Sequence, residues 1–371
     1  MDFSLGETQQ AVIEAAVGVL GQRQLQSQPP TPDDGFDRAL WKELGQAGLL
    51  GLAVPEWLGG GGLGVLETAV LLTEIGRRAA PVPALATLMM GVVPVTRWAG
   101  RGLQGHLLSG VAAGDFLLTA AVREPSEPMP PVPVTTASER EGTVSGVKIG
   151  VPYAAVANRI LVPATLREGG TAIMVIDPAA DGVTITRTPS STGAPEYTLR
   201  LDEVVANTIL GTNRADNRAV ADLYQCTLAG ACCLADGALA AALALTTEHV
   251  AARQQFGRPL ATFQAVAQHI ANVSIASRTL HLAALSSCWR LDTGRDAGPD
   301  LDVAAYWLAD QAPTALRTCH HLHGGTGMDV SYPLYRYSAL VKDLVRLVGG
   351  ADYRLGLLGA GAAGQEAPDV P

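Results

Sequence analysis

The sequence has few charged residues, and fewer basic than acidic ones. Charged residues make up 16% of the 371 positions, against about 25% in an average soluble protein. The 26 lysines and arginines against 35 aspartates and glutamates leave a formal net charge of −9. A nucleic-acid binder needs a basic surface to displace phosphate counterions, so this balance argues against that class. Hydrophobic residues make up 48%, which excludes a disordered chain.

Cysteine is scarce as well, and its spacing indicates no disulfide framework. The five cysteines include no CxxC pair, so a cysteine zinc site is not predicted either. Asp2 and Glu7 stand where a secretory signal would carry basic residues. We therefore expect a protein of the reducing cytoplasm. The cysteines are Cys226, Cys232, Cys233, Cys288 and Cys319.

Long apolar runs are limited to two stretches, and neither predicts a membrane span. The run from Ala79 to Thr96 contains three prolines, which would interrupt a spanning helix. The run from Cys226 to Thr247 carries Asp236 near its middle, where a charge costs about 2.5–3.5 kcal/mol on membrane insertion. We interpret the second run as a buried helix rich in small residues, and we expect no membrane partner.

Hydrophobic spacing divides the chain into helices, then strands, then helices. Helical periodicity precedes residue 116, and short β-prone runs separated by proline and glycine follow it. Long apolar-periodic stretches then predict helices over residues 221–253, 262–291, 301–322 and 339–358. Segregated elements of this kind indicate an α+β fold and not an alternating Rossmann sheet. The predicted domains are an N-terminal helical domain (1–116), a middle β domain (117–214), a C-terminal helical domain (215–360) and a loose tail (361–371).

Three glycine-containing segments carry the candidate functional residues. The first, Leu49 to Gly64, takes a helix into a glycine loop and by itself indicates a turn. The second begins with Arg253 at a helix end, where a guanidinium suits a diphosphate, although an ordinary surface arginine explains it equally well. In the third, His320 to Gly327, backbone N–H groups of the turn could cradle an anion. The spacing of Cys319 and His323 would also allow a metal, but no further ligand completes that site.

Together these segments resemble the acyl-CoA dehydrogenase family over nearly the whole chain. The resemblance rests on GLLGLAVPEWLGGGGL, ARQQFGRPLATFQAV and HLHGGTGMDVSYPLYRY, in that order and spacing. It implies an N-terminal helical domain, a middle β domain and a C-terminal four-helix bundle through which tetramers form. Within the family, the chain looks most like actinobacterial subunits that act on steroid side-chain CoA thioesters and that are often two-gene heteromers.

The resemblance also implies FAD, bound across a subunit boundary. The flavin ring and the acyl-CoA lie in one subunit, and the neighbour's bundle contacts the diphosphate and adenosine end. Electron-transfer flavoprotein is the implied electron acceptor. Matching the family's motifs residue by residue assigns the neighbour's role to positions in the second and third segments: Arg253, Gln255, Phe256, His321, Gly324 and Gly325.

The family's catalytic glutamate has no counterpart in this sequence. That glutamate removes a weakly acidic α proton, which requires a carboxylate. Aligning Tyr332-Pro333 with the family's Tyr-Pro places one position of the glutamate at Val348. Shifting that alignment by one residue places it at Gly349 instead. The other lies 26 residues before Arg253 and is Thr227. The nearest acid downstream of the first position is Asp352.

The residues that would face the flavin ring within the same subunit are also replaced. The family's Thr-Glu-Pro begins here with Arg123, and its downstream Gly-Ser-Asp is absent. The tryptophan and threonine of the family's Gly-x-Lys-x-Trp-Ile-Thr correspond to Gly150 and Pro152. A stacking surface and a hydrogen-bond donor are thereby lost. The half of the cofactor site within one subunit is eroded, while the half that reaches the neighbour is kept.

This asymmetry favours a subunit that lacks the catalytic base in a heteromeric, FAD-dependent acyl-CoA dehydrogenase. A paralogous partner would supply the glutamate and bind most of the acyl-CoA, in a two-plus-two heterotetramer. One alternative is a self-sufficient homotetramer with Asp352 as a relocated base. The other is a flavin-free structural or regulatory subunit. The leading hypothesis assigns no catalytic residue to this chain.

Overall fold

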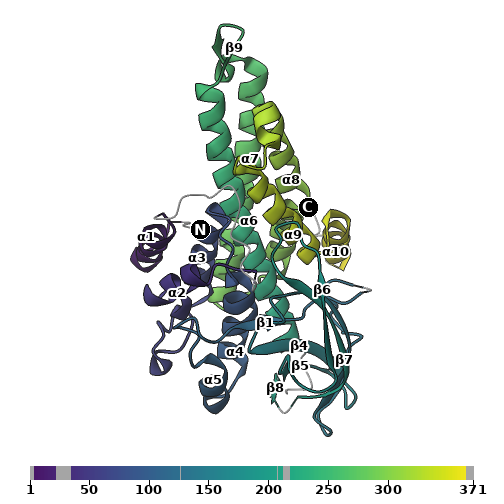
Figure 1. Cartoon of the computed structure of the whole chain (residues 1–371). Coiled ribbons are helices and arrows are strands. Elements are labelled where there is room, and N and C mark those ends of the chain that lie inside the picture. The colour runs from purple at the N-terminus through teal and green to yellow at the C-terminus, as the bar shows by residue number, and fades with distance from the viewer. Residues whose placement is uncertain (1–3, 22–34, 126, 207, 212–217, 365–371) are drawn as a thin grey trace, which may run out of the picture.

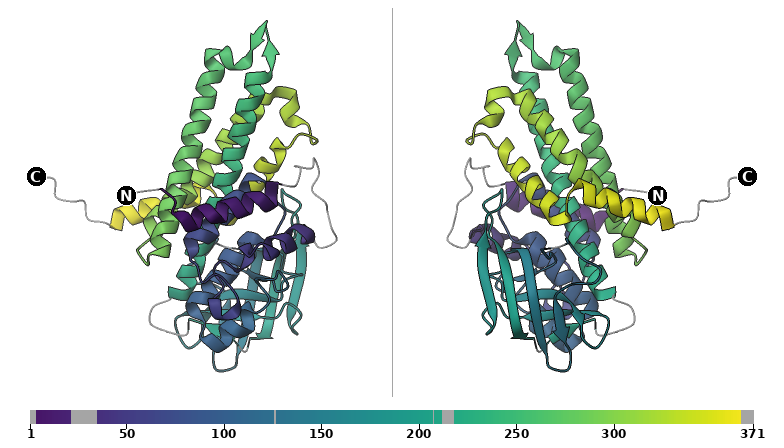
Figure 2. Two further views of the ribbon diagram at one scale, coloured as in Figure 1. Left: turned by 90° about the vertical axis from the view of Figure 1, so that its left-hand side faces the viewer. Right: turned by 90° about the vertical axis from the view of Figure 1, so that its right-hand side faces the viewer.

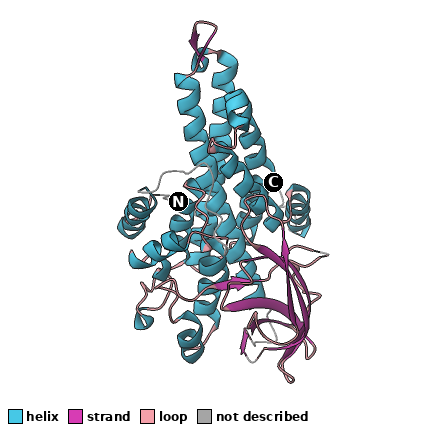
Figure 3. Ribbon diagram, in the orientation of Figure 1, coloured by secondary structure: helices cyan, strands magenta, loops and turns pink. Residues whose placement is uncertain are grey.

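The computed structural model describes residues 4–21, 35–125, 127–206, 208–211 and 218–364. Helices, then strands, then helices follow one another along the chain, which confirms the predicted order (Figure 1, Figure 3). The long C-terminal helices extend away from the sheet and from the N-terminal helices (Figure 2). The helical parts share one hydrophobic core, and the sheet has a second core of its own.

The N-terminal helices pack against the long helix that opens the C-terminal domain. Helix α3 lies within the stretch of helical periodicity before residue 116 and runs beside that long helix. The Asp37 carboxylate accepts the Leu40 N–H at 2.9 Å and caps the second helix. The elements are α1 (Glu7–Gly21), α2 (Arg38–Gln46), η1 (Leu49–Gly51), η2 (Glu56–Leu58), α3 (Val65–Arg77), η3 (Leu85–Val92), α4 (Val93–Trp98) and α5 (Arg101–Leu108).

The middle domain is one sheet with the strand order β6-β7-β3-β2-β4-β5-β8, and β1 pairs in parallel with β4. Five strands lie where β-prone runs predicted them. Three further strands were not predicted, and for β7 the alternation of buried Leu199 and Leu201 with polar neighbours was the available signal. The strands are β1 (Leu118–Ala120), β2 (Thr136–Ser138), β3 (Thr143–Pro152), β4 (Arg159–Leu166), β5 (Thr171–Ile176), β6 (Val183–Thr188), β7 (Glu196–Val205) and β8 (Thr208–Leu210).

The C-terminal domain is a bundle of long helices with a small hairpin at its far end (Figure 1). The first three helices agree closely with the predicted ranges. The elements are α6 (Arg218–Ala252), β9 (Gln254–Gln255), β10 (Arg258–Pro259), η4 (Leu260–Thr262), α7 (Gln264–Asp292), α8 (Gly298–His323), η5 (Gly324–Met328), α9 (Leu334–Val348) and α10 (Ala351–Gly364).

The prediction of one helix over residues 339–358 is wrong. Gly349 and Gly350 have φ values of +96° and +85°, in the left-handed region that ends a helix, so the segment forms α9 and α10. Helix α10 continues to Gly364, so the first four residues of the predicted loose tail are helical. Residues 365–371 of that tail lie outside the described residues.

Helix α6 is the core of the molecule. Among the described helices it is the only one with the length and apolar composition of a membrane span, and 72% of its most apolar window is buried within the protein. Asp236, near its middle, is hydrogen-bonded through Oδ2 to Nδ1 of His281 at 2.8 Å. Helices α3, α7, α8 and α9 all pack against α6. This arrangement agrees with a buried helix rich in small residues.

The crossing of α3 and α6 depends on two glycines. A Cβ built on Gly237 would overlap the Thr73 carbonyl oxygen, and one on Gly76 would overlap the Leu234 carbonyl oxygen. We expect Gly237→Ala to lower the free energy of unfolding by about 1–3 kcal/mol, because two backbones must move apart. Gly18 on α1 is the matched control, since a Cβ there meets nothing within 4 Å. Urea unfolding of both variants tests this, and equal midpoints would contradict it.

Candidate functional site

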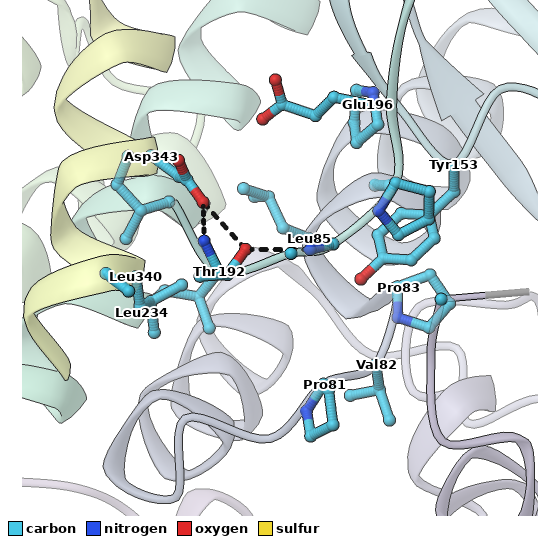
Figure 4. Close-up of a pocket in the computed structure, with 18 of the residues that line it drawn as sticks. Pro81, Val82, Pro83, Leu85, Tyr153, Thr192, Glu196, Leu234, Leu340 and Asp343 are labelled. Atoms are coloured by element: carbon cyan, nitrogen blue, oxygen red, sulfur yellow. Dashed lines mark hydrogen bonds between the residues drawn. The ribbon is translucent and has the colours of Figure 1, made fainter. Parts of the chain in front are cut away.

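A cavity of about 470 Å³ lies where the three domains meet (Figure 4). The loop that carries Pro81 and Pro83 forms one wall, and Leu234 of α6 lies at its back. Leu340 and Asp343 of α9 line the side where α9 meets the β domain, and Asp343 is hydrogen-bonded to Thr192 there (Figure 4). Most of the lining is apolar, as is usual for small-molecule sites.

The three positions that the resemblance places against the flavin ring all line this cavity: Arg123, Gly150 and Pro152. Gly150 has a φ of +60°, and a Cβ built on it would come within 2.7 Å of Nη1 of Arg123. The Arg123 guanidinium therefore occupies the space beside position 150, where the family has a tryptophan side chain. Proline at position 152 adds no hydrogen-bond donor to this wall. The residues present do not fit a flavin ring stacked here.

Charged residues fasten the β domain to α9 at the same wall. The Arg346 guanidinium donates to Glu196 at 2.8 Å and to Asp343 at 3.1 Å. The Asp343 carboxylate also accepts the Ser191 N–H at 2.8 Å and both the N–H and the hydroxyl of Thr192 at 2.9 and 2.8 Å (Figure 4). Burial raises the pKa of Glu196 and lowers that of Arg123. These contacts hold the wall in a closed, self-paired arrangement.

Neither family position for the base carries a usable carboxylate. Thr227 is fully buried in α6, and its hydroxyl donates to the Leu223 carbonyl at 2.8 Å. Val348 is fully buried at the end of α9. A Cβ on Gly349 would come within 2.6 Å of Pro128, so that position excludes a glutamate as well. Asp352 is exposed on α10 and does not line the cavity.

A buried ion pair lies next to the altered wall. The Lys148 ammonium donates to Glu124 at 2.7 Å, and both side chains are almost fully buried. Burial lowers the pKa of Lys148 to about 8, although Glu124 opposes the shift. Burial raises the pKa of Glu124, but the Lys148 charge and the hydrogen bonds outweigh it and leave that pKa below its usual value. The same carboxylate accepts the N–H groups of Val134 and Thr135 at 2.7 and 2.9 Å.

The predicted cofactor residues of the second segment form a hairpin at the far end of the bundle (Figure 1). Arg253 follows α6, is exposed, and has no side-chain hydrogen bond or ion pair with the described residues. Gln255 pairs with Arg258 across the hairpin. Phe256 sits at the turn with a φ of +54° and is 90% exposed. A hairpin turn brings it to the surface.

The predicted residues of the third segment lie at the same end of the bundle. His321 in the last turn of α8, and Gly324 and Gly325 in η5 directly after it, are exposed. His269 on α7 packs edge-on against His321, with ring centroids 5.9 Å apart. His249, one helical turn before Arg253, stacks on His323 at 4.3 Å. Two histidine contacts thus join the hairpin helices to the glycine turn, and sequence reasoning missed both His249 and His269.

The metal alternative for Cys319 and His323 finds no support in the described residues. The Nδ1 atom of His323 is hydrogen-bonded to the Cys319 carbonyl at 2.8 Å, and Nε2 lies 3.0 Å from the Tyr332 hydroxyl. Nowhere in the described ranges do three or more histidine, cysteine or acidic side chains gather as metal ligands. The five cysteines are buried and free.

The fold agrees with the comparisons to known proteins. Profiles described as the N-terminal and the C-terminal domain of acyl-CoA dehydrogenase match residues 7–115 and 229–352. The chain belongs to the acyl-CoA dehydrogenase family, which is a family of oxidoreductases.

Several relatives resemble the chain over almost its whole length. "Acyl-CoA dehydrogenase FadE28" of Mycobacterium tuberculosis is 46% identical over 97% of this chain and 98% of its own. A variant of the Tcur3481-Tcur3483 steroid ACAD is 32% identical over 97% of this chain and 100% of its own, with a TM-score of 0.88. The ChsE4-ChsE5 complex from M. tuberculosis contains a chain 29% identical over 99% of this chain and 100% of its own, with a TM-score of 0.87.

Proposed function

We propose that this chain is the subunit without a catalytic base in a heteromeric, FAD-dependent acyl-CoA dehydrogenase. A paralogous partner supplies the glutamate and the flavin-ring wall, and it binds most of the acyl-CoA. This chain completes the partner's FAD site from the far end of its bundle. The assembly is a two-plus-two heterotetramer with two FAD molecules, and electron-transfer flavoprotein accepts the electrons.

One observation carries the proposal: the residues that the resemblance places at the flavin ring are packed closed, whereas those that it places at the neighbour's cofactor are exposed. The cavity wall holds Arg123 beside Gly150 and has no catalytic carboxylate at the family positions. At the bundle end, Arg253 and His321 are exposed. A chain that used a flavin of its own would need the first set of residues, whereas a chain that serves a neighbour needs only the second.

The exposed surface around the bundle end supports a partner at that position. Phe256, Ile275, Met328 and Val330 are large apolar side chains with 61–90% of their surface exposed. Exposed apolar side chains near a functional site are typical of protein interfaces. A steroid-derived acyl-CoA is the proposed substrate, because the similar Tcur3481-Tcur3483 protein is described as a steroid ACAD.

FAD supplies the hydride-accepting ring in this proposal, and that ring belongs to the partner. The guanidinium of Arg253 is exposed and has no partner among the described residues, so it suits the diphosphate. The exposed glycines of the turn, Gly324 and Gly325, leave room for close approach of the cofactor. Gln255, Phe256 and His321 would contact the diphosphate and adenosine end from the same side.

The structure argues against one of the two alternative functions and leaves the other to experiment. A relocated base at Asp352 requires that carboxylate to face a closed site, yet Asp352 is exposed and outside the cavity. A flavin-free structural subunit requires only the fold, and it is separated from our proposal by experiment.

Flavin stoichiometry tests the proposal directly. We expect the chain to be colourless when purified alone, and the complex with a paralogous base-carrying subunit to hold one FAD per heterodimer. Absorbance near 450 nm against protein concentration gives the ratio. One FAD per chain in the isolated protein would overturn the proposal in favour of a self-sufficient enzyme. A complex whose flavin content equals that of the partner alone would favour the structural subunit.

A further inference from the structure

Within the described residues, the Arg123 side chain at this wall has no hydrogen bond or ion pair, and Glu196 attracts it only from a longer distance. Its Nε atom is buried without an acceptor among those residues. A buried donor left unpaired is unfavourable, and a bound acceptor would remove that cost. Because the guanidinium already fills the space beside Gly150, the acceptor must lie on the cavity side of this wall.

The remaining charges around the cavity favour an anion. Arg187 and Arg336 line it together with Arg123, against the carboxylates of Glu196 and Asp343. Both carboxylates form ion pairs with Arg346, although Oε2 of Glu196 accepts no hydrogen bond from the described residues. Arg336 donates to the Ala79 carbonyl at 3.0 Å. Positive charge is therefore in excess, and a cavity lined by an excess of one sign concentrates the opposite sign.

The rest of the cavity is shaped for an apolar body. The apolar side chains that line the same space as Arg123 include Ile75, Val82, Leu85, Leu234, Leu340 and Leu344. The ring of Tyr153 lines the same space, with its hydroxyl directed inward (Figure 4). Arg187 is exposed, so the cavity reaches solvent on the β6 side. The volume of about 470 Å³ is within the range of small-molecule sites.

We propose that this cavity binds an amphipathic carboxylic acid, whose carboxylate pairs with Arg123 and whose apolar body lies among the leucine and proline walls. The ligand is a free acid and not a substrate that reacts, because no flavin ring fits the wall. The proposal does not depend on the role of the bundle end. Fatty acids and steroid acids share this chemistry, and the two sources are distinguished by the probes below.

Calorimetric titration of the purified full-length chain tests the site. The probes are decanoate, deoxycholate and, as the neutral control, 1-decanol. We expect one molecule of at least one acid to bind per chain. Binding of decanoate alone identifies a straight-chain acid, and binding of deoxycholate identifies a steroid acid. Failure of both acids to bind overturns the proposal, and it leaves the flavin stoichiometry of the complex unaffected.

Variants of two residues separate the charged contact from the apolar one. Arg123→Met should weaken binding of the acid about tenfold or more, with little effect on decanol, and Arg123→Lys should restore part of the loss. Equal weakening of the acid and the alcohol by Arg123→Met would overturn the role of Arg123. Leu340→Trp fills the cavity from α9 and should abolish binding of every probe. Retained binding in that variant would place the ligand elsewhere, even if Arg123→Met does not fold.

Discussion

Lys148→Met should lower the free energy of unfolding by about 3–5 kcal/mol, because it leaves the buried Glu124 carboxylate without its counter-charge. The methionine side chain has nearly the length of the lysine, so the loss reflects charge more than packing. Denaturant unfolding at pH 7 measures it. The double variant Lys148→Met with Glu124→Gln is the control, since a neutral amide removes the uncompensated charge and still offers an acceptor to the Thr135 N–H. The double variant should be more stable than the single one.

The pH dependence of these proteins gives a second readout of the same pair. In the wild type, the pKa of Glu124 is lower in the folded protein than in the unfolded chain. Its ionised carboxylate therefore stabilises the fold at any pH above the unfolded pKa, and this stabilisation is lost as the pH falls through the folded pKa. In Lys148→Met the pKa of Glu124 should lie above its unfolded value, because burial acts without the opposing charge. The variant then gains stability as the pH falls. The gap between the two proteins should narrow from pH 7 to pH 5, and a constant gap would contradict a charge effect.

Arg253→Ala should weaken FAD binding by the heteromeric complex roughly 10- to 100-fold, as expected for the loss of a charged hydrogen bond to a diphosphate. The side chain is exposed and without a partner in the described part of the chain, so its removal should not affect folding. Flavin content after gel filtration and titration of the apo complex with FAD measure the effect. The melting temperature of the isolated chain should stay unchanged.

Arg317→Ala is the matched control for Arg253→Ala. Arg317 is equally exposed on α8, and its guanidinium donates to the Thr314 hydroxyl at 2.8 Å on the same helix. Its removal should leave flavin content as in the wild type. If Arg253→Ala also keeps the full flavin content, this chain does not contact the cofactor, and the structural-subunit hypothesis gains support.

Local chemistry in the sequence was enough to predict the order of the elements and three of the four bundle helices. Helical periodicity over long stretches is a strong signal, because every turn repeats it. The missed strand β7 and the break at Gly349 depend on weaker signals. A short strand repeats its alternation only a few times, and a glycine pair interrupts a helix only when its φ angles become positive.

The sequence by itself also determined which residues are missing from the cofactor site, since a glycine, a proline and a valine cannot act as a stacking surface, a donor or a base. Only the tertiary structure decided what replaces them. The guanidinium of Arg123 lies beside Gly150, and Arg346 pairs with Glu196, which lies 150 positions away in the chain. Likewise, nothing in the sequences of α6 and α8 indicates that His249 of the first helix stacks on His323 of the second. Such contacts depend on how the domains pack, and packing geometry is not encoded in any local pattern.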